Sequence, residues 1–286
     1  MHGGFRRGEM ALVQGAALRY ALLFFFFLSK VSSLEIKPWL NNAYEFCLDV
    51  DYSYSRYAKV QNAHPQLHHP SNDQLLNFDL GFVPSPTWSC DLDVEFVNTP
   101  RQKWGFRSGA AQLRMLWLDD IEGDPISLTT GVDARVVSQR SLEDVSTPYH
   151  GNWNFALSTA VGKEWAEGEF WRYRTFGFLS LGIATRGYPW LFMHYAFLAN
   201  IEDRHRWELF ADGYFGFGNQ SSIDPNDFNG YADIAHRSVD IGAAYAYHFP
   251  AWGTLSFCYD FRLFARSFPE YVSFFTIQYQ LPFSPF

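Results

Sequence analysis

Apolar and polar residues alternate along stretches of roughly ten residues, and such stretches recur after the N-terminal region. The segment FCLDVDYSY (46–54), for example, places Leu48 and Val50 on one side of an extended backbone and Asp49 and Asp51 on the other. This period of two is typical of a β-strand with one apolar and one polar face. The sequence therefore predicts an all-β chain of about twelve strands, within a range of roughly ten to fourteen, that run up and down in antiparallel order.

The predicted connections between these strands differ in length. The longer ones cover 61–73, 97–103, 139–151, 185–189, 218–236 and 267–270, and the intervening ones, such as 84–87, 165–168 and 249–252, have about four to seven residues. Because long and short connections alternate, all the long ones emerge at one end of the structure. This is the arrangement of an antiparallel transmembrane barrel with both chain ends on the periplasmic side.

The apolar faces are too bulky for the interior of a soluble barrel. Aromatic residues make up 19% of the chain, and roughly sixty large apolar side chains on the strands would overfill such an interior. A barrel with its apolar side facing lipid and its polar side facing a lumen accommodates both sets. The tryptophans lie near predicted strand ends, which favours an aromatic girdle at the membrane interfaces: Trp88, Trp117, Trp153, Trp165, Trp171, Trp190, Trp207 and Trp252. A soluble β-sandwich or a lipocalin-like barrel is the alternative fold.

The C-terminal stretch FFTIQYQLPFSPF (274–286) alternates large apolar and polar residues up to the end of its pattern. It resembles the last strand of Gram-negative outer-membrane β-barrel proteins, which implies an outer-membrane location among lipid and recognition by the outer-membrane assembly machinery. The assembly signal that this resemblance implies comprises Phe275, Ile277, Tyr279, Leu281, Phe283 and Phe286. The chain departs from the pattern because three residues follow Phe283.

The N-terminal region has the features of a secretory signal peptide. Arg6, Arg7 and Arg19 precede the apolar run YALLFFFFL (20–28), and small residues before Leu34 suit cleavage there. The run is too short to span a bilayer as a helix, although a membrane anchor remains the alternative interpretation. We expect residues 1–33 to be a signal peptide and residues 34–286 to form the barrel.

Charged residues gather on the polar faces, which we expect to line the lumen. The candidates are Asp49, Asp51, Asp79, Asp91, Asp93, Glu95, Arg114, Asp133, Arg135, Arg172, Arg174, His194, Glu208, Asp212, Asp240, Asp260, Arg262 and Arg266. Acids outnumber arginines in this set, which favours the passage of cations through a narrow channel for small hydrophilic solutes. The alternative is that these charges pair and fill the interior, as in a plugged barrel.

Other functional classes find less support. The net charge of −8, with no basic stretch and no glycine-rich phosphate loop, argues against nucleic-acid and nucleotide partners, and no cofactor is expected. The three cysteines form no CxxC pair, and neither the adjacent His68 and His69 nor the acidic loop 224–233 has metal-ligand spacing. Two alternatives remain open: a lipid-modifying hydrolase built on His194 with Ser180 and Asp212, and a structural or adhesive surface protein that acts through its loops.

Overall fold

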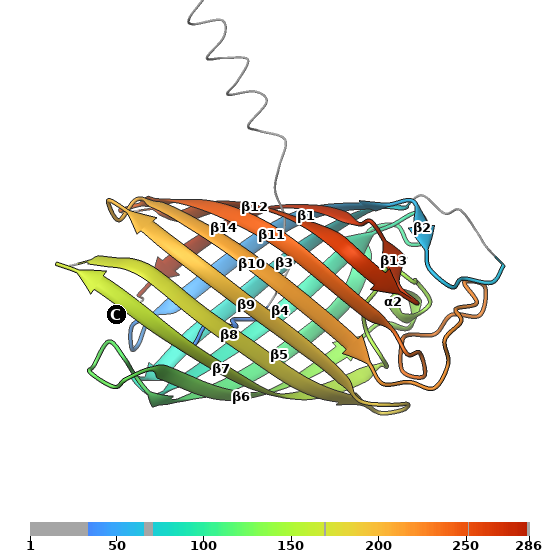
Figure 1. Ribbon diagram of the computed structural model, residues 1–286, viewed down its shortest axis with the longest axis horizontal. Helices are drawn as coiled ribbons and strands as arrows, with labels where there is room; N and C mark the ends of the chain where they lie inside the picture. The colour runs from blue at the N-terminus through green and yellow to red at the C-terminus, as the bar shows by residue number, and fades with distance from the viewer. Residues whose placement is uncertain (1–33, 66–70, 169, 251, 285–286) are drawn as a thin grey trace, which may run out of the picture.

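The computed structural model describes residues 34–65, 71–168, 170–250 and 252–284, and its strands close into a twelve-stranded antiparallel barrel (Figure 1). The barrel strands are β1 (Phe46–Tyr57), β3 (Ser71–Ser85), β4 (Trp88–Asn98), β5 (Gly105–Leu118), β6 (Ser127–Val137), β7 (Trp153–Glu167), β8 (Phe170–Ala184), β9 (Trp190–Ile201), β10 (His205–Gly216), β11 (Arg237–Phe249), β12 (Gly253–Arg266) and β14 (Ser273–Phe283). Each strand pairs with its neighbours in the sequence, and β1 closes the ring by pairing with both β3 and β14. The predicted all-β, up-and-down barrel is confirmed.

The outer surface of the barrel is apolar and its inner side is polar. On β7, Leu157 is 65% exposed, whereas the next residue, Ser158, is buried. On β9, Tyr195 is 58% exposed, whereas His194 before it is 3% exposed. Alternation along a strand turns successive side chains to opposite sides of the wall, so the exposed set forms a continuous apolar exterior suited to lipid. Within the described residues, no helix is long and apolar enough to cross a bilayer.

The connections group at the two ends of the barrel. Of the described residues, 58–65, 99–104, 138–152, 185–189, 217–236 and 267–272 lie at one end, the loop end, and 86–87, 119–126, 168, 202–204, 250 and 252 lie at the other, the short-turn end. The predicted grouping is therefore present, but the alternation in length is not strict. The turn 119–126 at the short-turn end is longer than the loop 185–189 at the loop end. Asp120 in this turn accepts a hydrogen bond from Trp39.

The connections at the loop end fold together into a hydrophobic unit, here called the loop cap. It contains β2 (Lys59–Val60), β13 (Pro269–Glu270) and the short helix α2 (Gln139–Leu142), visible at the right of Figure 1. Its core consists of Tyr57, Val60, Ala63, Val145, Ile223, Phe228, Tyr231, Ile234, Ala265, Phe268 and Val272. The Tyr231 side chain is fully buried, and its hydroxyl donates a hydrogen bond to the Val145 carbonyl at 2.6 Å. These loops thus pack on one another instead of extending separately into solvent.

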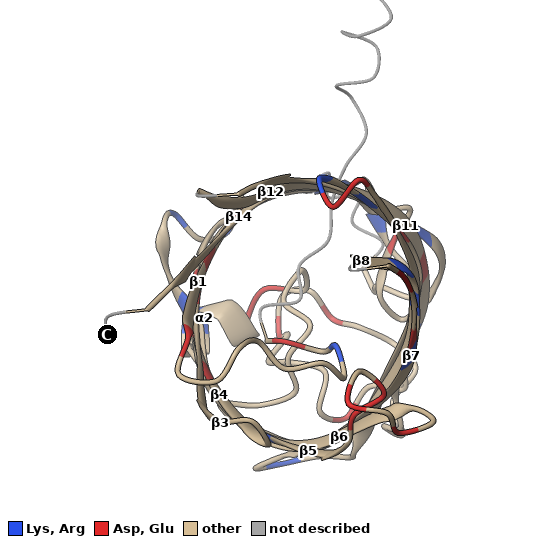
Figure 2. Ribbon diagram, turned by 90° about the vertical axis from the view of Figure 1, so that its left-hand side faces the viewer, with Lys and Arg blue, Asp and Glu red and all other residues tan. Residues whose placement is uncertain are grey.

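A chain segment also occupies the inside of the barrel. Residues 34–45 precede β1, and Trp39 among them packs on inward-facing side chains of the ring of strands, which Figure 2 shows along the barrel axis. Trp39 is buried against Phe176 and Phe210 of the inner wall. Gly162 on β7 makes room for this contact, because a Cβ atom there would lie 2.6 Å from Pro38 Cγ and 2.9 Å from the Trp39 ring. The lumen is therefore partly filled by the residues that precede β1.

Candidate functional site in the barrel lumen

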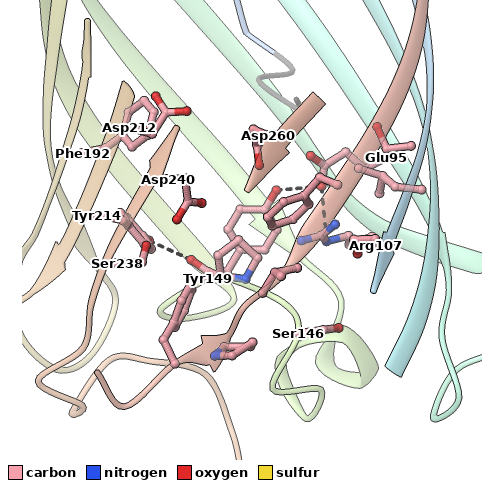
Figure 3. A pocket seen from close by; sticks show the side chains of 18 of the residues that line it. Glu95, Arg107, Ser146, Tyr149, Phe192, Asp212, Tyr214, Ser238, Asp240 and Asp260 are labelled. Carbon is pink, nitrogen blue, oxygen red and sulfur yellow. Dashed lines mark hydrogen bonds and ion pairs between the residues drawn. The ribbon is translucent and has the colours of Figure 1, made fainter. Parts of the chain in front are cut away.

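Residues 34–41, here called the inner segment, divide the space inside the barrel into two chambers. The loop chamber, between the inner segment and the loop cap, has a volume of ≈ 330 Å³ (Figure 3). The short-turn chamber, on the other side of the segment, has a volume of ≈ 310 Å³. Leu34 and Ile36 contribute to the walls of both chambers. The lumen is thus hollow on each side of a single short stretch of chain.

One wall of the loop chamber holds a cluster of ion pairs. The Arg135 guanidinium lies 2.8 Å from a carboxylate oxygen of Asp93 and 3.4 Å from one of Glu95. Arg107 approaches Glu95 at 3.6 Å, and the Tyr149 hydroxyl donates to the same carboxylate at 2.6 Å (Figure 3). Both guanidinium groups lie 5.2 Å from the centre of the Tyr149 ring. Burial raises the pKa of Tyr149, so this hydroxyl remains a donor at neutral pH and fixes the loop 138–152 to the wall.

The opposite wall of the loop chamber holds a second ion pair. Arg262 on β12 binds Asp240 on β11 through two hydrogen bonds of 2.8 Å each, the bidentate geometry that guanidinium and carboxylate favour. The same guanidinium lies 4.6 Å from the centre of the Phe268 ring, which belongs to the loop cap. Both charged side chains are buried, so their hydrogen bonds compensate the loss of water. This pair connects the barrel wall to the cap.

Two buried histidines lie where the cap meets the loop chamber. The Nε2 atoms of His150 and His236 are 3.1 Å apart, so one ring donates and the other accepts. Burial lowers the pKa of both imidazoles, that of His236 to about 3. His150 stacks on Trp190 with ring centres 5.6 Å apart, and His236 stacks on Phe268 at 5.1 Å. At neutral pH both rings are uncharged and act as packing elements.

The short-turn chamber is lined by more acids than bases. Its described acids are Glu35, Asp49, Asp51, Asp79, Asp91 and Glu208, and its described cations are Lys37, Arg174 and Arg206. The Lys37 ammonium lies 3.8 Å from Glu35 within the inner segment. The Glu35 carboxylate raises the pKa of Lys37 against the effect of burial, and Glu208 and Asp49 raise it further. Burial opposes ionisation of Glu35, but Lys37 and Arg114 outweigh it and lower its pKa.

Three contacts hold the inner segment against the wall. Arg114 donates a hydrogen bond to the Lys37 carbonyl oxygen at 2.7 Å. The Trp39 indole N–H donates to Asp120 in the turn 119–126 at 2.9 Å. The Arg174 guanidinium lies 4.7 Å from the centre of the Trp39 ring, within the range of a cation–π contact. Trp39 is therefore the main anchor of the segment.

Most of the lumen candidates from the sequence surround these chambers. Glu95, Asp133, Arg135, Asp212, Asp240, Asp260 and Arg262 line the loop chamber; Asp49, Asp51, Asp79, Asp91, Arg174 and Glu208 line the short-turn chamber; Asp93, Arg114 and His194 are buried in the wall. Arg172 and Arg266 line neither chamber in the described structure and are exposed. Arg172 pairs instead with exposed Glu167 at 2.8 Å.

β-Bulges explain both exceptions. The pairing of β7 with β8 shifts so that Trp165 opposes Tyr173 while Ala166 opposes Trp171, which leaves Arg172 as the extra residue. A second shift, between β11 and β12, makes Leu263 the extra residue, and the alternation after it is reversed as far as Arg266. An extra residue in one strand changes which side the following side chains face. An uninterrupted period of two could not predict these positions.

Several lumen residues were missed in the sequence. Glu35 and Lys37 precede the first strand, and Arg206 lies one residue before the predicted start of its strand. Arg107 occupies a third bulge, where Glu95 opposes Ser108 and Phe96 opposes Phe106. Two tryptophans expected on the outer surface also line the chambers: Trp171 contributes to the short-turn chamber and Trp190 to the loop chamber.

The arrangement around His194 differs from a hydrolase triad. The Nδ1 atom of His194 lies 2.7 Å from Asp212, the residue directly opposite it on β10. Ser180 pairs with Phe192, two residues before His194 on β9, whereas Phe178 is the residue of β8 directly opposite His194. Phe176 and Phe210 pack against the His194 ring. The geometry fits a wall contact between imidazole and carboxylate.

Metal and thiol chemistry have little geometric support in the described part of the chain. Within it, no group of three or more His, Cys, Asp or Glu side chains converges as a metal site. The described cysteines, Cys47, Cys90 and Cys258, form no disulfide. His68, His69, the predicted signal peptide 1–33 and Phe286 lie outside the described residues.

The strand that carries the expected assembly signal forms the closing seam of the barrel. β14 pairs with β1 over its whole length, and Phe283 stacks on Phe46 with ring centres 5.5 Å apart. Ile277 is 49% exposed and Phe283 is 40% exposed, which places them on the outer surface. The apolar side of this strand therefore lies on the outer surface of the barrel.

No family model and no curated protein matches the sequence. Among solved structures, the chain is similar to the COG4313 outer membrane channel from Pseudomonas putida F1, with a TM-score of 0.66 and 11% identity over 89% of this chain and 100% of that one. It is also similar to the NanC porin, with a TM-score of 0.53 and 10% identity over 81% of this chain and 97% of that one. At these identities the likeness concerns the fold. The chain therefore has the fold of a closed antiparallel β-barrel with an apolar exterior and a polar lumen.

Proposed function

We propose that this protein is an outer-membrane channel for small hydrophilic solutes, with an acid-rich lumen that favours cations. The observation that carries this proposal is the pair of chambers inside the barrel. Each is lined by acidic and basic side chains, and one short segment separates them. A barrel whose interior served only as a structural core would have these volumes filled by side chains.

The exterior supports a membrane location. Exposed tryptophans lie near strand ends, with Trp104 and Trp153 toward the loop end and Trp117, Trp165 and Trp252 toward the short-turn end. Amphipathic rings in these positions suit an aromatic girdle at the two interfaces. The proposal includes export by a cleavable signal peptide, residues 1–33, and insertion by the outer-membrane assembly machinery through the β14 signal.

In this structure the inner segment lies between the two chambers, so passage requires it to move or a solute to pass beside it. The segment is bound to the wall by side-chain contacts and not by strand pairing. Such contacts break more easily than a barrel ladder, which extends over every strand. The proposed channel therefore has a narrow, intermittent conducting path.

Planar-bilayer recording of the refolded protein tests the proposal. Stepwise currents with a reversal potential that indicates cation preference are expected. A barrel that inserts, resists denaturation by SDS at low temperature and yet carries no steps is a plugged structural barrel, and the channel proposal then fails.

A further inference from the structure

One carboxylate in the short-turn chamber lacks a partner. Asp79 on β3 is 5% exposed and lines this chamber. Its Oδ2 atom has no hydrogen-bond partner, and no cationic side chain lies within 4.0 Å of it among the described residues. A buried polar group without a hydrogen-bond partner is costly, so such groups mark positions where a ligand can supply the missing interaction.

The neighbours of Asp79 are also acids, which makes a cationic partner for Asp79 still more favourable. On one side Asp79 lies directly opposite Asp49 of β1, and on the other side directly opposite Asp93 of β4. Like charges placed opposite one another on adjacent strands repel. Arg135 compensates Asp93 at 2.8 Å, whereas the contact of Asp49 is an amide donor, Gln280, at 3.3 Å. Asp49 and Asp79 thus form a pair of acids that no arginine of the described chain neutralises.

The protein already places an ammonium group in this chamber. Lys37 of the inner segment lines it, and the carboxylates of Glu35, Glu208 and Asp49, in that order, raise the pKa of Lys37. The inner segment therefore acts as a tethered cation among these acids. An ammonium group is suited to such a site because it needs no fixed coordination geometry, and the acids in the described residues do not converge as metal ligands.

We infer that the short-turn chamber is a binding site for small organic cations that carry ammonium groups. Asp49 and Asp79 bind the cation, and the Lys37 ammonium competes with it. The chamber volume of ≈ 310 Å³ restricts the ligand to a compact molecule. This inference rests on the proposed channel function, because it names the class of solute that the lumen selects.

The test uses 1,4-diaminobutane as the probe in two assays of the full refolded chain. Block of single-channel current reports binding in the lumen, and isothermal titration calorimetry in detergent reports binding without conduction. Succinate and 1,4-butanediol have the same four-carbon length with negative and no charge, and neither should bind. Asp79→Asn should weaken diamine binding at least tenfold, whereas Asp133→Asn, the same change in the loop chamber, should leave the affinity unchanged.

Lys37→Gln is an independent variant that should change the affinity for diamine in the opposite direction. It removes the tethered ammonium and should strengthen diamine binding several-fold, which a purely structural role of Asp79 does not predict. If the wild-type protein conducts but Asp79→Asn and Lys37→Gln bind diamine as the wild type does, the inference is wrong and the channel proposal stands. If the wild-type protein is silent but calorimetry gives the expected pattern, the site is real and the channel proposal fails. Absence of diamine binding in both assays overturns the inference.

Discussion

Replacement of Trp39 by alanine should release the inner segment and leave the barrel intact. Trp39 is 7% exposed, packs edge-on against Phe176 with ring centres 6.0 Å apart, and donates a hydrogen bond to Asp120. The segment belongs to no strand of the ring, so Trp39→Ala removes its anchor without breaking a strand ladder. The change should therefore affect conduction more than stability of the barrel.

The size of the effect follows from the contacts that are lost. Truncation of a buried aromatic side chain to alanine costs about 3 to 5 kcal/mol. If the docked segment loses about 3 kcal/mol, the ratio of undocked to docked molecules rises roughly a hundredfold. The open fraction of the channel should rise in proportion as long as the docked state dominates.

Single-channel recording checks this prediction, with Trp165→Ala as the matched control. Trp165 is 48% exposed on the outer side of β7, so its loss changes the same residue type without touching the segment. We expect a higher open fraction for Trp39→Ala and wild-type behaviour for Trp165→Ala. An unchanged open fraction in a Trp39→Ala protein that migrates as a folded barrel would refute the view that this side chain holds the segment.

Three further predictions concern the wall and the cap. Gly162→Ala places a Cβ atom 2.6 Å from Pro38 and should open the channel as Trp39→Ala does. Gly177→Ala is the control, because the nearest atom there is 3.9 Å away, and it should conduct like the wild type in the same recording. Asp240→Asn removes the bidentate carboxylate partner of buried Arg262 and should destabilise the barrel by about 3 kcal/mol in a denaturant titration. An Asp240→Asn protein as stable as the wild type contradicts the buried-pair interpretation. Burial lowers the pKa of His236 from 6.5 to about 3. Between these two pH values the imidazole binds a proton in the unfolded cap but not in the folded cap. The stability of the folded cap should therefore fall by up to about 1.4 kcal/mol per pH unit as the pH falls below 6.5. Hydrogen exchange of 217–236 at pH 7 and pH 5 measures this loss, and equal protection at both values rules it out.

The barrel and the polarity of its wall could be predicted from the sequence because both depend on a local pattern. A period of two assigns each side chain to one side of the wall, and this suffices for residues such as Asp79 and Leu157. The pattern fails where a bulge adds a residue, as at Arg172, Leu263 and Arg107, because pairing shifts depend on the neighbouring strand and leave little trace in one sequence.

The position of the inner segment in the lumen could not be predicted from the sequence, for a different reason. The stretch LEIKPWL (34–40) has no long period, and its position depends on contacts with residues far along the chain, such as Asp120 and Arg174. The packing of 58–65 against 217–236 in the loop cap is likewise a long-range contact between two irregular segments. Local periodicity carries no information about such contacts.

The most direct test of this account compares the conductance of two refolded chains, one that begins at Leu34 and one that begins at Asn42. The shorter chain lacks the inner segment, so its two chambers should join into one continuous acid-lined path. We predict larger and longer-lived current steps for it, with cation preference in its reversal potential. Absence of current from the shorter chain, once it is folded and inserted, would contradict the claim that residues 34–41 separate the two chambers of a hollow lumen and limit conduction through it.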